Sequence, residues 1–101
     1  MNVNGQPYLR RWAPEILIEL APSVNMPEPQ PRRFNELLAA IAGISDRMLS
    51  QRLRDLEDAG LLRRSVIDGP PVHVRYRLTP LGVSYASRLG DLIALDAGGP
   101  L

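Results

Sequence analysis

Residues 45 to 64 read Ser45-Asp46-Arg47-Met48-Leu49-Ser50-Gln51-Arg52-Leu53-Arg54-Asp55-Leu56-Glu57-Asp58-Ala59-Gly60-Leu61-Leu62-Arg63-Arg64. The first part predicts a helix over residues 46–59, because leucines recur at spacings of three and four. Ser45 can cap this helix, and a carboxylate at Asp46 suits the positive end of the helix dipole. Gly60 then ends the helix, since glycine readily adopts the left-handed conformation.

A second, shorter helix is predicted immediately before this one. Asn35 can cap a helix that runs from Glu36 to Ala42, and Gly43 can end it. Ile44 would be a buried spacer in the tight turn that follows. Two helices joined by a short turn containing glycine are typical of a helix-turn-helix.

A β-hairpin is predicted after the longer helix. Residues 61–67 and 72–79 read as strands, and apolar and polar residues alternate along the second strand. The tip is Asp68-Gly69-Pro70-Pro71. Thr79 can cap a last helix that has Pro80 in its first position and runs to about Asp96. The fold class is therefore mainly α with a small β-hairpin (α+β), a winged helix-turn-helix, and we expect it to be dimeric.

The remaining segments complete the predicted organisation. Residues 1–7 read as a flexible N-terminal arm, and residues 97–101 as a frayed tail. Residues 8–21 read as helical with a break near Trp12-Ala13, because Pro14 cannot lie deep inside a helix. Residues 22–31 carry four prolines and read as an extended loop. We expect residues 8–96 to form one DNA-binding domain whose terminal helices mediate dimerisation.

The composition excludes several classes of function. The chain has 101 residues and a net charge of +1, and its 12 basic residues are all arginine. It has no cysteine, which excludes disulfides and thiolate sites, and His73 is its only histidine. No phosphate loop or nucleophile motif is present. We therefore expect neither an enzyme nor a cofactor or metal site. Without a membrane span or signal peptide, we expect the protein in the cytoplasm.

The polar face of the helix over residues 46–59 supplies candidate DNA-reading residues. Arg47, Ser50, Gln51 and Arg54 cluster on the side opposite the leucines. Guanidinium, amide and hydroxyl groups are the side chains that read bases in a major groove. The alternative is an ordinary solvated helix face.

Further basic residues are candidates for contact with the DNA backbone. His73, Arg75 and Arg77 share one face of the second strand, and Arg33 lies just before the first helix of the pair. Arg64 is expected to brace the hairpin instead. The alternative for each of these residues is a solubilising surface charge.

The last helix has a wider apolar arc than a small core requires. Together with the N-terminal segment, this arc could form a symmetric dimer interface. The candidate interface residues are Leu9, Trp12, Tyr85, Leu89, Leu92 and Ile93. The alternative is packing of these residues within one chain.

Several ordered motifs resemble the HxlR family, small bacterial winged-helix transcription regulators related to the MarR group. The motifs are Arg33-Phe34-Asn35-Glu36-Leu37, Ile41-Ala42-Gly43-Ile44-Ser45, Leu49-Ser50-Gln51-Arg52-Leu53-Arg54-Asp55-Leu56-Glu57, Ala59-Gly60-Leu61-Leu62-Arg63-Arg64 and Pro71-Val72-His73-Val74-Arg75-Tyr76-Arg77-Leu78-Thr79-Pro80-Leu81-Gly82. The resemblance implies a homodimer on a pseudo-palindromic operator, with the helix over residues 46–59 in the major groove and the hairpin as the wing.

The chain departs from that family in two ways. Many members carry an N-terminal cysteine that senses oxidants, whereas this chain has none. The proline-rich segment over residues 22–31 is also longer than the usual connection.

We therefore expect a sequence-specific, DNA-binding transcriptional regulator. Two alternatives stay open. One is a winged helix that binds a protein partner. The other is a regulator whose DNA binding is controlled by a small-molecule effector between the dimer helices, near Trp12 and Tyr85.

Overall fold

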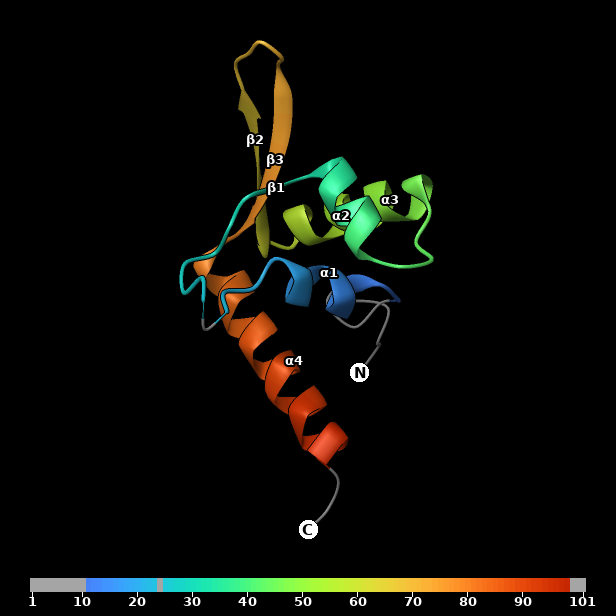
Figure 1. The fold of residues 1–101 in the computed structure, drawn as a ribbon, viewed down its shortest axis with the longest axis vertical. Helices are drawn as coiled ribbons and strands as arrows, with labels where there is room; N and C mark the ends of the chain where they lie inside the picture. The colour runs from blue at the N-terminus through green and yellow to red at the C-terminus, as the bar shows by residue number, and fades with distance from the viewer. Residues whose placement is uncertain (1–10, 24, 99–101) are drawn as a thin grey trace.

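The computed structural model describes residues 11–23 and 25–98, with side chains through Asp91. Four helices and three strands follow one another along the described chain (Figure 1). Their order is α1 (Ala13–Glu19), β1 (Arg32–Arg33), α2 (Phe34–Ala40), α3 (Asp46–Asp58), β2 (Leu62–Ile67), β3 (His73–Leu78) and α4 (Pro80–Gly98). The mixed helix-and-hairpin architecture that the sequence predicts is confirmed.

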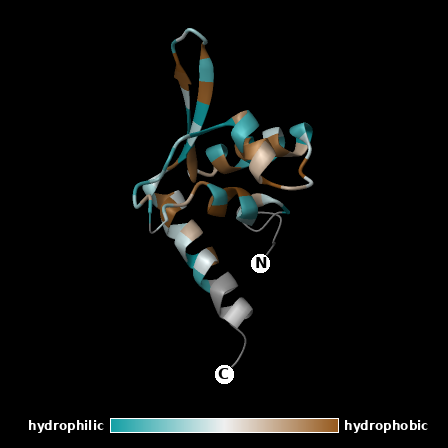
Figure 2. Ribbon diagram, in the orientation of Figure 1, coloured by the Kyte–Doolittle hydropathy of each residue, from teal (hydrophilic) through white to brown (hydrophobic). Residues whose placement is uncertain are grey.

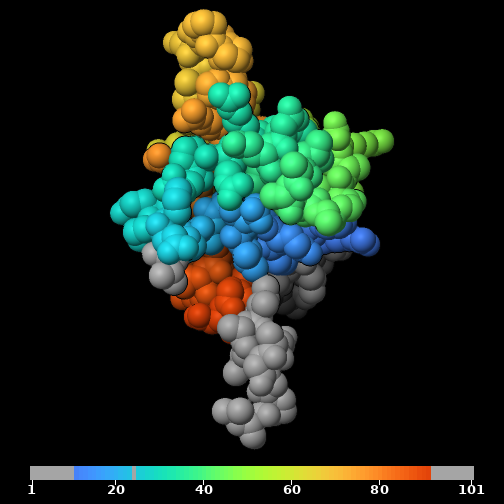
Figure 3. Space-filling model, viewed as in Figure 1, coloured from blue at the N-terminus to red at the C-terminus, as the bar shows by residue number. Residues whose placement is uncertain are grey.

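The sheet is antiparallel with the strand order β1-β3-β2. Strands β2 and β3 form the expected hairpin, with Leu62 opposite Leu78 at its root and Ile67 opposite His73 near its tip. Sequence analysis missed β1, whose two residues pair with Tyr76 and Arg75. Figure 3 shows the hairpin standing out from the body of the molecule as a narrow projection.

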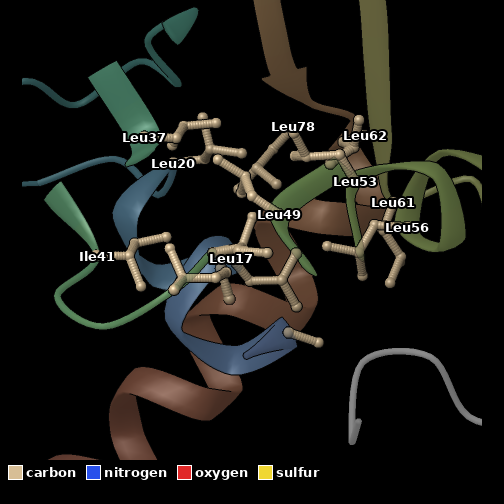
Figure 4. Close-up of a cluster of buried hydrophobic side chains, with 14 residues drawn as sticks. Leu17, Leu20, Leu37, Ile41, Leu49, Leu53, Leu56, Leu61, Leu62 and Leu78 are labelled. Atoms are coloured by element: carbon tan, nitrogen blue, oxygen red, sulfur yellow. The ribbon is translucent and has the colours of Figure 1, made fainter. Parts of the chain in front are cut away.

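One hydrophobic core lies beneath this hairpin, between the helices (Figure 4). Leucines from every side meet there, including Leu17 of α1, Leu37 of α2 and Leu53 of α3. Leu62 and Leu78 bring the root of the hairpin into the same core. Figure 2 shows hydrophobic and hydrophilic residues alternating along the projecting part of the hairpin, which lies beyond this core.

Local chemistry explains where α3 and α4 begin. The Ser45 hydroxyl accepts a hydrogen bond from the Met48 N–H at 3.1 Å, as an N-cap should. The Thr79 hydroxyl does the same for the Gly82 N–H at 3.0 Å, and it donates to the Gly60 carbonyl at 2.7 Å. A Cβ on residue 82 would lie 1.9 Å from the Leu61 carbonyl oxygen, so only glycine allows this close approach.

The two short helices depart from the predicted bounds. The predicted start of a helical segment after Trp12 is confirmed, because α1 begins at Ala13 with Pro14 in its first turn, but this helix ends at Glu19. Residues 8–10 of the predicted segment before the break lie outside the described residues. The expected cap at Asn35 is wrong: α2 begins at Phe34 and its N-cap is Arg33. Pairing of β1 with β3 fixes the backbone just before Phe34, and the Glu36 carboxylate accepts the Arg33 N–H at 2.8 Å.

The other bounds differ by small amounts. Helix α2 ends at Ala40 instead of Ala42, and Gly43 still takes a left-handed conformation, with φ of 88°. Helix α4 continues to Gly98, which takes the first two residues of the predicted tail into the helix. Between Pro22 and Pro31 the described residues form no helix or strand. The predicted arm over residues 1–7 lies outside the described residues.

Candidate nucleic-acid interface

Helix α3 presents the four predicted base-reading residues together. Arg47, Ser50, Gln51 and Arg54 are all exposed on the helix. The helix is fixed on its other side, where Leu49, Leu53 and Leu56 are buried with at most 2% exposure. The polar face is therefore carried by a helix that is anchored in the core and capped at its start.

A hollow of about 400 Å³ joins α3 to the hairpin. Its walls come from Ser50 and Arg54 on α3 and from Arg64 and Tyr76 on the hairpin. Arg64 lies opposite Tyr76 in the ladder, and residues opposite each other project from the same face of a sheet. Sequence analysis assigned Arg64 only a bracing role. Strand alternation could have shown that Arg64 shares a face with the buried Leu62.

The other face of the hairpin carries a different set of arginines. Arg63 is opposite Arg77, and Ser65 is opposite Arg75, so these residues project away from the face that carries Arg64. They line a hollow of about 830 Å³ together with Pro29 and other residues of the proline-rich segment. The predicted wing arginines and Arg64 therefore lie on opposite faces.

A third hollow, of about 660 Å³, brings together three of the predicted backbone contacts. Arg33, His73 and Arg75 line it beside the start of α2. Arg77 does not line this hollow and lies nearer the root of the hairpin, opposite Arg63.

His73 is engaged within the hairpin itself. Its Nδ1 lies 2.9 Å from the Pro71 carbonyl oxygen, and its Nε2 is buried with no hydrogen-bond partner among the residues that the structure describes. A ring held in this way braces the tip of the hairpin. A phosphate could reach Nε2 only if the ring moved.

Most arginines of this surface have no carboxylate partner. Among the side chains of residues 11–23 and 25–91, ion pairs join only Arg32 to Glu19, at 3.4 Å, and Arg52 to Asp55. Arg47, Arg54 and Arg64 are therefore exposed cations outside any ion pair among these residues, and Glu57 is the one carboxylate that lines the hollow beside Arg54 and Arg64. Such cations suit an anionic partner such as a phosphate chain.

A model of one protein family, described as HxlR-like helix-turn-helix, matches residues 9–97. The chain belongs to the HxlR-like helix-turn-helix family. It is 36% identical over 83 residues to YvaP of Bacillus subtilis (strain 168), an uncharacterized HTH-type transcriptional regulator, covering 82% of this chain and 70% of YvaP. It is 37% identical over 82 residues to YtfH of Escherichia coli (strain K12), named in the same way, covering 81% of this chain and 60% of YtfH.

The fold agrees with this family. The reduced form of the transcriptional regulator YodB from B. subtilis superimposes with a TM-score of 0.72 and 30% identity, over 90% of this chain and 82% of YodB. The present chain is therefore a winged-helix transcriptional regulator of the HxlR type. Both of these relatives are named as transcriptional regulators.

The structure describes the side chains of three of the six predicted dimer-interface residues. Trp12, Tyr85 and Leu89 are each half-buried and pack against the chain's own core. Leu9 and the side chains of Leu92 and Ile93 lie outside what the structure describes. Figure 1 shows α4 continuing well past α1 and away from the body of the molecule.

One of the two residues predicted to lie near an effector lines a hollow. Trp12 lines a hollow of about 490 Å³ between α1 and α2, together with Pro14, Ile18 and Ile41. Tyr85 does not line that hollow. Trp12 and Tyr85 therefore do not both line this hollow.

The part of the chain that the structure describes has neither a candidate metal site nor a membrane-spanning helix. No group of three or more histidine, cysteine, aspartate or glutamate residues is placed to hold a metal ion. Among the same residues, no helix combines the length and apolar character needed to cross a membrane.

Proposed function

We propose that this HxlR-type regulator binds double-stranded DNA as a homodimer and recognises a pseudo-palindromic operator. The observation that carries the proposal is the surface formed by α3 and the hairpin. Arg54 and Arg64 line a hollow there with Ser50, and Arg47 is exposed one turn before Ser50 on α3; none of the three forms an ion pair among the described residues. Helix α3 would enter the major groove, and the projecting hairpin would lie along the neighbouring backbone.

In this proposal the two elements do different work. Base edges are read by Arg47, Ser50, Gln51 and Arg54. Their guanidinium, amide and hydroxyl groups match the donor and acceptor pattern of the major groove. Arg33, Arg75 and Arg77 hold phosphates, and we add Arg64 to this group because it borders the hollow beside Arg54. His73 contributes by bracing the hairpin tip, where it contacts Pro71.

The length and position of α4 support the homodimer. The helix runs beyond the body of the chain (Figure 1), so its far end has no intramolecular neighbour among the described helices. A second copy would cover it through a two-fold contact that includes Tyr85 and Leu89. Two α3 helices would then face successive turns of DNA.

Selection of bound duplexes from a random pool tests this proposal. At about 150 mM salt, where unspecific attraction is screened, we expect an inverted repeat with half-sites about one helical turn, or a multiple of it, apart. Recovery of no motif, with binding that disappears as salt rises, would contradict the proposal. It would favour a winged helix that binds a protein partner.

An effector that controls DNA binding has separate support in the hollow beside Trp12. Trp12 is the only tryptophan, so its fluorescence reports on occupancy of this hollow. Quenching by a small molecule that also releases operator DNA would support this second proposal. Quenching without release would contradict it.

A further inference from the structure

A chain of polar contacts runs along one edge of α3, between its buried and exposed faces. Arg52 Nη1 donates to Asp55 Oδ2 one turn later on the helix. Both side chains are mostly buried, with 15% and 18% exposure. Arg52 Nε also donates to the Arg11 carbonyl oxygen at 3.1 Å, which ties α3 to the backbone just before α1.

The contacts continue to a predicted base-reading residue. Gln51 Nε2 donates to the second oxygen of Asp55, Oδ1, at 3.3 Å and a spacing of four residues. Because a carboxylate can only accept, the amide must turn its NH₂ group toward Asp55. Gln51 then keeps its carbonyl oxygen and one N–H for a partner outside the protein.

We propose that Arg52 and Asp55 are positioning residues that hold the Gln51 amide in the orientation needed to read adenine. Adenine presents the N7 acceptor and the N6 donor in the major groove, which match the free N–H and the carbonyl oxygen of Gln51. Guanine presents two acceptors there and would leave that carbonyl oxygen facing another acceptor. The operator therefore contains an A·T pair whose recognition depends on Asp55.

The arrangement lowers the entropy lost on binding. An exposed glutamine samples many rotamers, and ordering such a side chain opposes association. Asp55 already restricts Gln51 in the free protein. Arg52 restricts Asp55 through Nη1, while its Nε is held by the Arg11 carbonyl oxygen, so both donors of one planar group fix the guanidinium. The inference rests on the proposed function, since it assumes that α3 faces the major groove.

The test compares affinities for the selected operator and for duplexes that carry one substituted base pair. We expect Gln51→Ala to lower discrimination about tenfold at a single A·T pair, as loss of a bidentate contact should. Asp55→Ala should give the same loss at the same pair, and the double variant should lose no more. Discrimination is a ratio of two affinities, so a reduced fraction of folded protein cancels.

Substitutions at Arg52 separate positioning from general support of the fold. Arg52→Lys keeps a cation for Asp55 and should keep the discrimination at that base pair. Arg52→Met has similar length without charge and should lose it. The positioning role is wrong if both Arg52 variants discriminate between the base pairs as well as the wild type does. It is also wrong if Asp55→Ala keeps the discrimination that Gln51→Ala removes.

Failure of this inference can be distinguished from failure of the proposed function. If the wild type selects a motif and Arg54→Ala weakens binding, but Gln51→Ala affects no position or affects a G·C pair, only the reading by Gln51 is overturned. If the wild type selects no motif at all, the proposed function itself fails and this inference falls with it.

Discussion

Helix α3 and the β2–β3 hairpin both carry unpaired arginines, but they are supported in different ways. The helix is capped by Ser45 and rests on three buried leucines. The hairpin is anchored at its root by the core and midway by the pairing of β1 with β3, while Val66 and Val72 near its tip are 57% and 67% exposed. Under the proposed function, the rigid element would read sequence and the projecting element would add attraction to the DNA backbone.

The largest expected effect comes from removing the support of α3. Leu56 is fully buried, so Leu56→Ala should lower the free energy of unfolding by about 2–5 kcal/mol through lost contacts and a cavity. Denaturant unfolding measures this change. A loss below about 1 kcal/mol would contradict the difference drawn between the helix and the hairpin, because the stability of α3 would then not depend on its buried leucines.

The second-largest effect is expected from removing a guanidinium group that is proposed to read a base. Arg54→Ala should weaken operator binding by about 1–3 kcal/mol and relax specificity at one position. Unfolding should change little, because Arg54 is exposed and forms no ion pair among the described residues. Fluorescence anisotropy with matched and substituted duplexes measures both. Equal losses on every duplex would move Arg54 from the base-reading group to the backbone group.

Hairpin arginines should affect all sequences alike. Arg75→Ala and Arg64→Ala should each weaken operator and scrambled DNA to the same extent, and each should reduce the salt dependence by about 0.9 per lost phosphate contact. The two residues project from opposite faces. If only one variant changes the salt dependence of the affinity, the face of the hairpin that carries that arginine is the one that meets DNA. The other arginine then makes no phosphate contact.

The smallest effect is expected at the hairpin tip. Val72→Ser should change the free energy of unfolding by no more than about 0.5 kcal/mol, because the side chain is mostly exposed and lies outside the core. A matched denaturation with Leu56→Ala provides the contrast. A large loss at Val72 would mean that the tip is covered in the folded protein, for example by a second copy.

The elements with strong local signals could be predicted from the sequence. The leucine spacing and the Ser45 cap placed α3, and Thr79 followed by Pro80 placed the start of α4. These signals are local because each involves residues within one helical turn. The same reasoning gave the apolar and polar faces of α3, where the structure exposes all four predicted base-reading residues.

The missed features depend on contacts between distant parts of the chain. Strand β1 has only two residues, and it exists because β3 offers an edge to pair with. Asn35 is a good capping residue in isolation, but this pairing starts α2 two residues earlier than predicted. Gly82 reads as an ordinary helix residue until the Leu61 carbonyl is placed against it.

A crystal structure of the protein bound to its selected operator tests the central claim most directly. The account predicts α3 in the major groove, with the Arg54 guanidinium within hydrogen-bonding distance of a base edge and the hairpin on the adjacent backbone. It would be contradicted if the exposed face of α3 pointed away from the DNA, or if the hairpin contacted bases while α3 met only phosphates.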